Sequence, residues 1–128
     1  MTFWHRWVGL PWELGADPRD GRAACCFVTA QAVREQLGMH WPADRMRAWY
    51  EEARLGAWEE LRWDWSALTE TIEGPEAGAL IRFDNPSNGS FGVGVLPNDL
   101  TLITVRHNGR LIAGPVSACG GLKFFRLR

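Results

Sequence analysis

Residues 20–39 read Asp-Gly-Arg-Ala-Ala-Cys-Cys-Phe-Val-Thr-Ala-Gln-Ala-Val-Arg-Glu-Gln-Leu-Gly-Met, a loop that runs into a helical pattern. With a period of about 3.6 residues, one sector of a helix over residues 25–37 is apolar. This sector holds Cys26, Thr29, Ala30, Val33 and Leu37. The opposite sector holds Gln31, Arg34 and Glu35. The stretch therefore predicts an amphipathic helix that begins at two adjacent cysteines and ends at Gly38.

The start of this helix is a place where a thiolate is stabilised. The helix dipole and the free backbone N–H groups of the first turn both favour a negative charge there. Cys25 lies at the mouth of the helix, outside the apolar sector, and is the candidate nucleophile. Cys26 points toward the core and is interpreted as a small hydrophobic residue, as most buried cysteines are.

The rest of the chain divides into a helical and a strand-like half. Helical patterns cover about residues 2–8, 43–54 and 58–72. Strand patterns cover 79–83, 91–96, 101–106, 111–112 and 122–127, with a hairpin signal at Asn108-Gly109. Helices followed by an antiparallel meander predict an α+β fold. We expect one domain over 1–128, with a helical half at about 1–74 packed on an antiparallel half at about 75–128.

Three motifs in the first 50 residues fit a known pattern. Trp7-Val8-Gly9-Leu10-Pro11-Trp12 matches aromatic-x-Gly-x-Pro-Trp, and Cys25 takes the place of the cysteine in Asp-Cys-Trp-Gly or Asp-Cys-Ser-Gly. Leu37-Gly38 then closes the helix before a loop with Pro42. Together they resemble the NlpC-type branch of the papain-like cysteine peptidases, in particular short versions found among bacteriophage tail proteins. The resemblance implies a papain-like fold in which the cysteine helix packs on the sheet that brings the histidine.

The sequence departs from this family at the other catalytic positions. The Asp before the cysteine is Ala24, and the residues after it are Cys26-Phe27. The resemblance places the catalytic histidine at Ser90 or at Gly92, depending on which glycine of the strand is aligned. The residue that would orient that histidine falls near Thr104. Since a cysteine peptidase needs a base within hydrogen-bond reach of the thiolate, the site is interpreted as degenerate.

Other residues offer weaker alternatives. His5 precedes the cysteine loop, and His40 follows the far end of the helix. His107 adjoins the hairpin turn and is the sole candidate for a relocated base, although an exposed histidine is the commoner outcome there. The pairs Glu51-Glu52 and Glu59-Glu60 are interpreted as solvated helix faces, because adjacent residues point about 100° apart. No short-spaced Cys or His ligand set predicts a metal, and no cofactor is expected.

The eight tryptophans all lie in the first half of the chain. They suit either a helical layer with a large aromatic core or a surface that binds another protein. Trp63 and Trp65 cannot both face one core from a single helix, and Trp4 and Trp7 lie near a terminus. We therefore expect at least one of these two pairs to take part in an intermolecular contact.

Composition excludes several classes of protein. Hydrophobic residues make up 46% of the 128, which argues against disorder. The net charge of −1, with scattered Lys and Arg, argues against a nucleic-acid surface. No signal peptide and no transmembrane segment is predicted. Three cysteines, two of them adjacent, do not suggest a disulfide framework, so we expect synthesis in a reducing cytoplasm.

Three hypotheses of function follow. The first is a non-catalytic papain-like component of a phage tail or tail-like particle, near its distal end, with other tail proteins as partners and the virion as location. The second is an active endopeptidase of cell-wall peptide stems, with Cys25 as nucleophile, His107 as base and peptidoglycan as partner. The third is a cytoplasmic tail-assembly factor that is absent from the finished particle.

Overall fold

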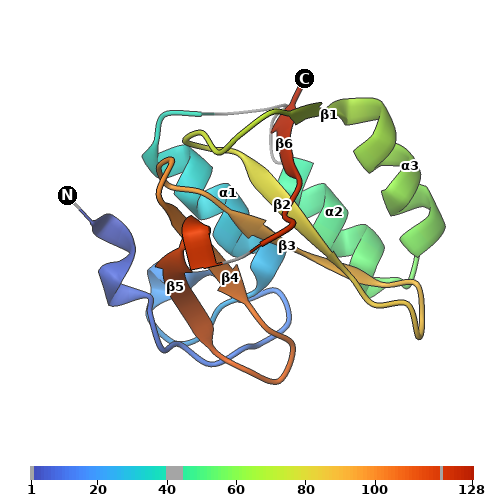
Figure 1. The fold of residues 1–128 in the computed structure, drawn as a ribbon. Coiled ribbons are helices and arrows are strands. Elements are labelled where there is room, and N and C mark those ends of the chain that lie inside the picture. Colours follow the sequence, from blue (N-terminus) through green and yellow to red (C-terminus); the bar gives the residue numbers. More distant parts are fainter. Residues whose placement is uncertain (1, 40–44, 119) are drawn as a thin grey trace.

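The computed structural model describes residues 2–39, 45–118 and 120–128, and its architecture is α+β, as the sequence predicts (Figure 1). In this described part of the chain, three α-helices precede a six-stranded antiparallel sheet. The α-helices are α1 (Cys26–Gln36), α2 (Arg45–Arg54) and α3 (Trp58–Leu68). The 3-10 helices are η1 (Phe3–Arg6), η2 (Pro18–Asp20) and η3 (Val116–Ala118). The strands are β1 (Thr69–Ile72), β2 (Leu80–Asp84), β3 (Phe91–Val95), β4 (Thr101–Val105), β5 (Leu111–Pro115) and β6 (Phe124–Leu127).

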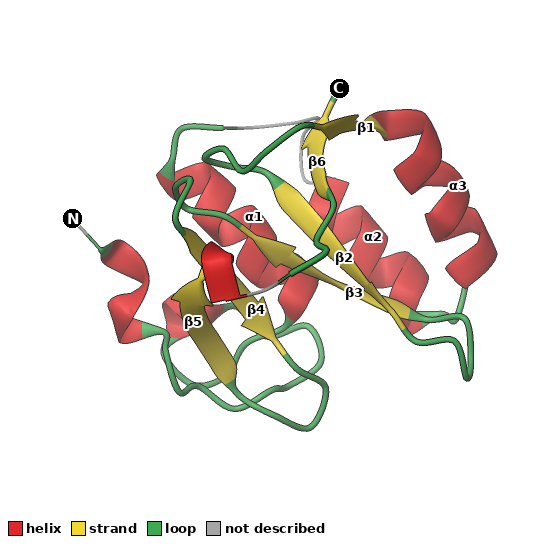
Figure 2. Cartoon of the chain, in the orientation of Figure 1, coloured by secondary structure: helices red, strands yellow, loops and turns green. Residues whose placement is uncertain are grey.

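The strands lie in the order β1-β6-β2-β3-β4-β5 (Figure 2). The segment from β2 to β5 is a meander of neighbouring strands, and β6 then returns to pair between β1 and β2. Strands β2 and β3 pair over their whole length, from Leu80 opposite Val95 to Asp84 opposite Phe91. Strands β3 and β4 pair only at Gly94–Thr104 and Val95–Ile103, so the first half of β3 has no partner on that side.

Helix α1 is more deeply buried than its pattern predicts. It packs against β3 and β4 on one side and against α2 on another. Gln31 and Arg34, expected on a solvated face, are only 7% and 8% exposed. The Arg34 Nη1 donates to the carbonyl oxygen of Gly78 at 2.6 Å, and the Gln31 Oε1 accepts from the backbone N–H of Arg47 at 3.2 Å. The predicted solvated face is therefore wrong: polar partners from neighbouring elements allow these two side chains to be enclosed.

The main core lies between the helices and one face of the sheet, and aromatic side chains fill much of it. The ring centroid of Trp65 is 5.5 Å from that of Trp49, 5.7 Å from that of Phe91 and 5.0 Å from that of Phe125. A smaller cluster on the other face comprises Ala79, Ile81, Leu96 and Leu102, with residues of η3 and β6 packed against it. The sheet therefore separates two apolar layers of unequal size.

Some predicted element boundaries are wrong. The helical pattern assigned to 58–72 ends at Leu68, and residues 69–72 form β1 instead. Thr69, Thr71 and Ile72 are β-branched, and pairing of Thr69 to Ile72 with β6 satisfies their backbone groups. Near the N-terminus, the helix expected over 2–8 shortens to η1. Residues 43 and 44, the expected start of the second helix, lie outside the described residues.

The longest described helices have 11 residues, and among them none has both the length and the apolar character that crossing a bilayer requires.

A carboxyl pair joins α2 to α3 and makes stability depend on pH. Burial, a hydrogen bond to Asp64 and repulsion from Asp64 and Glu60 raise the pKa of Glu52 to about 7, against the opposing charge of Arg45. The raised value means that the folded chain retains a proton that the unfolded chain releases above its ordinary pKa of 4.5. Stability contributed by this group is therefore present below pH 4.5 and is lost as the pH rises through 7.

We expect Glu52→Gln to remove this loss, because the amide can still donate to Asp64 and does not titrate. Thermal unfolding from pH 4.5 to 8 should show the variant gaining stability relative to the wild type as the pH rises. Glu51→Gln is the matched control, since Glu51 is exposed and pairs with Arg54 at 2.9 Å. Parallel profiles for wild type and Glu52→Gln would show that Glu52 does not titrate as described.

Candidate functional site

The two adjacent cysteines lie at the N-terminus of α1, inside the fold. Cys25 is the N-cap residue, with extended backbone at φ −122° and ψ 141°, and is 2% exposed. Cys26 is the first residue of the helix and is partly exposed. The prediction that Cys25 is open at the mouth of the helix is therefore wrong, whereas Cys26 packs against the main core as expected. The loop over residues 11–16 folds back over Cys25: Ala24 N–H donates to the Pro11 carbonyl at 2.9 Å, and Cys25 N–H donates to the Ala16 carbonyl at 3.1 Å.

The surroundings of the Cys25 sulfur favour its thiolate. The thiol of Cys26 and the backbone N–H groups of Gly15, Val28 and Phe27 lower the pKa of Cys25 to about 6, against the effect of burial. The Cys25 side chain forms no full capping hydrogen bond, so the backbone groups act on it as oriented dipoles. The sequence predicts the helix dipole and the N–H groups of the first turn, but not the Cys26 thiol or the Gly15 N–H.

Gly15 holds its N–H toward Cys25 through a conformation that few other residues adopt. Its φ is +78°, and a Cβ at this position would collide with the phenol of Tyr50 on α2. The sequence shows Gly15 only as a loop breaker. Its role in the cysteine site depends on a contact with α2, which no local pattern reports.

Cys26 faces the half of β3 that has no partner on its β4 side. A Cβ placed on Gly92 would lie 3.7 Å from the Cys26 Sγ, and the backbone N–H of Val93 also acts on this sulfur. Hydrogen bonding to Cys25 and burial raise the pKa of the Cys26 thiol well above its ordinary value. The contact between the two sulfurs therefore favours negative charge on Cys25, with Cys26 as the proton donor.

The structure separates the two positions that were alternatives for a catalytic base. Gly92 adjoins the cysteine pair, as described above. Ser90 belongs to the turn before β3, where its Oγ donates to the Asn88 Oδ1 at 2.6 Å. Thr104 on β4 lies opposite Gly94, two residues further along β3 than Gly92. Position 92 is therefore the one from which a side chain would touch a cysteine, and it has no side chain.

Neither described histidine reaches the cysteine pair. The ring of His107 packs on Trp12, with centroids 4.2 Å apart, and the side chain is exposed at the turn between β4 and β5. Trp12 lies between this turn and the cysteine helix. Its backbone N–H donates to the Gly109 carbonyl oxygen, and its backbone forms a parallel β-bridge with Ala24. His5 accepts or donates a hydrogen bond with Thr2 at 2.9 Å in the N-terminal segment. His40 and Cys119 lie outside the described residues.

The arrangement can stabilise a thiolate, but the residues that the structure describes do not supply the other parts of a nucleophilic site. No imidazole is among the described partners of the Cys25 sulfur. Cys25 is closed from solvent, so a peptide carbonyl has no approach to its sulfur in this conformation. In the described part of the chain, no group of three or more His, Cys, Asp or Glu side chains could hold a metal ion.

The two tryptophan pairs differ in their exposure to solvent. Trp4 and Trp7 are each 6% exposed and belong to the main core, where Phe3 packs edge-on against both. The argument that Trp63 and Trp65 face different directions is right. Trp65 is 2% exposed, whereas Trp63 is 75% exposed on the outer side of α3. Of the four residues considered for an interface, Trp63 alone is exposed.

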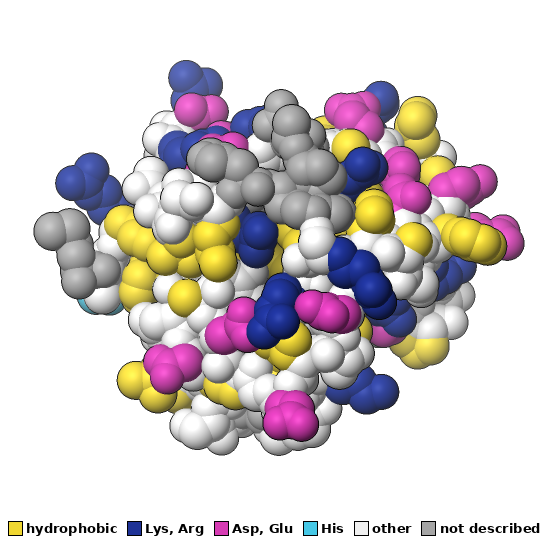
Figure 3. Space-filling model, turned by 90° about the horizontal axis from the view of Figure 1, so that it is seen from above, with side chains coloured by type: hydrophobic (Ala, Val, Ile, Leu, Met, Phe, Trp, Pro, Cys, Tyr) yellow, Lys and Arg dark blue, Asp and Glu magenta, His cyan; other side chains and the backbone are white. Residues whose placement is uncertain are grey.

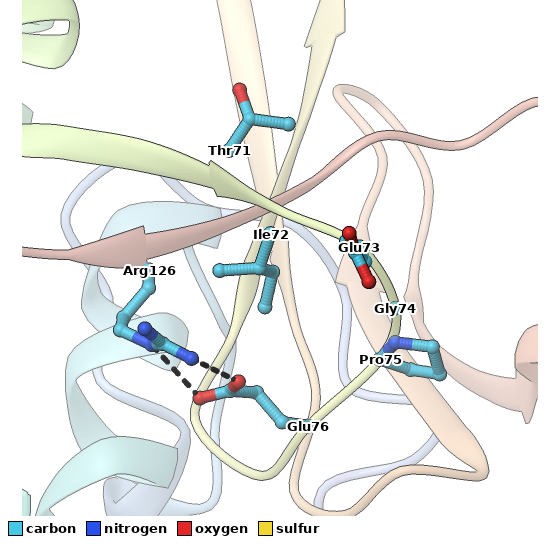
Figure 4. A pocket seen from close by; sticks show the side chains of 7 residues that line it. All are labelled: Thr71, Ile72, Glu73, Gly74, Pro75, Glu76 and Arg126. Atoms are coloured by element: carbon cyan, nitrogen blue, oxygen red, sulfur yellow. Dashed lines mark hydrogen bonds and ion pairs between the residues drawn. The ribbon is translucent and has the colours of Figure 1, made fainter.

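A shallow pocket occurs at the opposite edge of the sheet from β5, beside β1 and β6 (Figure 4). Figure 4 shows Arg126 turned toward Glu76, with the Nη2 and Oε1 atoms 2.7 Å apart. Arg126 also pairs with Glu70 at 3.3 Å. Because Glu76 and Glu70 already pair with its one arginine, this pocket offers no unpaired positive charge to a ligand, and it contains neither cysteine.

Comparison of the chain with protein-family models, with curated proteins and with solved structures finds no match. The function proposed below is therefore argued from the geometry of the site and from the sequence motifs.

Proposed function

We propose that the chain is a non-catalytic papain-like domain and a structural component of a bacteriophage tail or tail-like particle, near its distal end. Its partners are other tail proteins. The motifs around Trp7-Val8-Gly9-Leu10-Pro11-Trp12 and Cys25 support the family and the tail assignment by resemblance. An α+β fold with a cysteine at the start of a helix that packs on an antiparallel sheet agrees with that resemblance.

The observation that carries the non-catalytic role is that a Cβ placed on Gly92 would lie 3.7 Å from the Cys26 Sγ. In the family pattern the histidine opens the second strand of the sheet half, and this strand is β3 here. Its position 92 lies against the cysteine pair and is a glycine, so the proton acceptor is missing at the place where it is needed. The burial of Cys25 supports the same conclusion.

The alternative enzyme needs His107 as base. The His107 ring packs on Trp12, and no imidazole is among the described partners of the Cys25 sulfur. Backbone N–H groups surround that sulfur instead. These observations favour the structural role over the endopeptidase.

The test is the composition and infectivity of particles purified from cells that encode the chain. Mass spectrometry and gold-labelled antibody should find the chain in intact particles, at the distal end of the tail. Particles carrying Cys25→Ser should assemble and penetrate the cell wall as the wild type does. Absence from intact particles, with the chain present in the lysate, would favour the assembly factor. Normal particles of Cys25→Ser that fail to penetrate would favour the enzyme.

A further inference from the structure

The outer side of α3 carries an exposed indole among carboxylates. We call Glu59, Glu60 and Trp63 the acidic face. Trp63 is 75% exposed, and Glu59 and Glu60 are one helical turn before it and also exposed. Neither glutamate forms an ion pair with any described residue. In Figure 3, acidic and hydrophobic side chains alternate along the side of the molecule where α3 lies.

The turn between β4 and β5 carries the opposite charge. We call Arg106, His107 and Arg110 the basic turn. All three are exposed, and none has a carboxylate partner among residues 2–39, 45–118 and 120–128. The Arg110 Nη1 donates to the Gly9 carbonyl at 2.7 Å, which fixes this side chain near the exposed Val8. The turn therefore combines uncompensated positive charge with neighbouring apolar surface.

The two surfaces lie near opposite edges of the sheet. Helix α3 contacts β1, which is one edge strand, whereas the basic turn ends in β5, which is the other. In Figure 1, α3 lies at the right of the molecule and the β4–β5 hairpin lies toward the lower left. They cannot meet within one molecule, but they can meet between two.

We propose that the acidic face of one copy of this chain binds the basic turn of a second copy. The guanidinium groups of Arg106 and Arg110 would lie against the exposed Trp63 ring and between Glu59 and Glu60, where cation–π and ionic contacts act together. The occupant is a second copy because both complementary surfaces are present on this chain and neither forms an ion pair with a described residue.

Such a contact is heterologous, with a different surface used on each side. Repeated heterologous contacts produce a ring when the rotation closes and a filament when it does not. This inference deepens the proposed function by naming a partner in the particle. Its test uses the isolated chain, so it can fail while the chain is still found in particles, and the reverse also holds.

The test is the mean mass of the purified chain, measured by sedimentation and light scattering over a range of concentrations. The wild type should rise above the 14.4 kDa of one chain as concentration increases. It should return to that mass in about 0.5 M NaCl, where the Debye length falls to roughly 4 Å. The variants Glu59→Arg/Glu60→Arg and Arg106→Glu/Arg110→Glu should each remain monomeric. An equimolar mixture of the two should associate, because each then offers the charge that the other lacks.

Lys123→Glu is the control, since Lys123 is exposed outside both surfaces and its reversal should leave association unchanged. Circular dichroism checks that the variants fold, and Arg106→Glu alone replaces the double variant if loss of the Arg110–Gly9 bond unfolds it. A wild type that stays monomeric at every concentration and salt level overturns the proposal. So does association that neither charge reversal weakens, or a mixture that stays monomeric.

Discussion

Replacing Gly92 with histidine is expected to make Cys26 reactive. The Cβ of residue 92 would lie 3.7 Å from the Cys26 Sγ, and the backbone of Gly92 does not have the positive φ that disfavours side chains. An imidazolium there would stabilise the Cys26 thiolate, which burial and Cys25 now disfavour. While the pKa stays above the pH of measurement, each unit by which it falls raises the thiolate fraction about tenfold, so alkylation at pH 7 should accelerate by roughly ten- to a hundredfold.

The measurement is the rate of iodoacetamide labelling, resolved by mass spectrometry at each cysteine. Ser90→His is the matched control, because Ser90 is directed to the Asn88 side chain in the turn and not to the cysteines. It should label like the wild type. Equal acceleration by both variants would mean that the alignment of the base with position 92 is incorrect, and no acceleration by Gly92→His would mean that the side chain does not reach the thiol.

Replacing Trp65 with alanine is expected to destabilise the fold by about 3–5 kcal/mol, the usual cost of removing a buried large aromatic side chain. Trp65 is 2% exposed and contacts aromatic rings on α2, β3 and β6. The Arg82 guanidinium also lies 5.7 Å from its ring centroid. One substitution thus opens a cavity where both the helical layer and the sheet meet. The free energy of unfolding from urea denaturation measures the loss.

Trp63→Ala is the control for this prediction, because it removes the same side chain from the same helix at a position that is 75% exposed. Its effect on the monomer should stay within about 0.5 kcal/mol, as for most surface substitutions. Comparable losses for the two variants would contradict the assignment of Trp65 to the core and of Trp63 to the surface.

Much of the fold follows from local sequence patterns. The period of α1, the β-branched residues of β4 and the Asn108-Gly109 turn predict elements that the structure contains. The same patterns fail at β1, because residues 69–72 become a strand through pairing with β6, more than 50 residues later in the chain. They fail again for Gln31 and Arg34, whose burial depends on partners in α2 and in the segment before β2. Local patterns carry no information about such distant partners.

The candidate site was only partly predictable for the same reason. The cysteine pair and the absence of a histidine on β3 can be read from the sequence. The burial of Cys25 cannot, because this residue is enclosed by the loop that contains Gly15. A helical wheel treats the first turn as open to solvent, and here two distant segments cover it.

The central claim is that the Cys25 sulfur, whose pKa its neighbours lower, is shielded from solvent and has no imidazole among its described partners. The rate of iodoacetamide labelling at Cys25 in the native protein tests it most directly, with the urea-unfolded chain as reference at the same pH. At pH 7 the account predicts native labelling at least about tenfold slower than in the unfolded chain, because the 2% exposed sulfur reacts only after local opening. Fast, stoichiometric labelling of native Cys25 at pH 6 would contradict the claim and indicate an accessible, activated nucleophile.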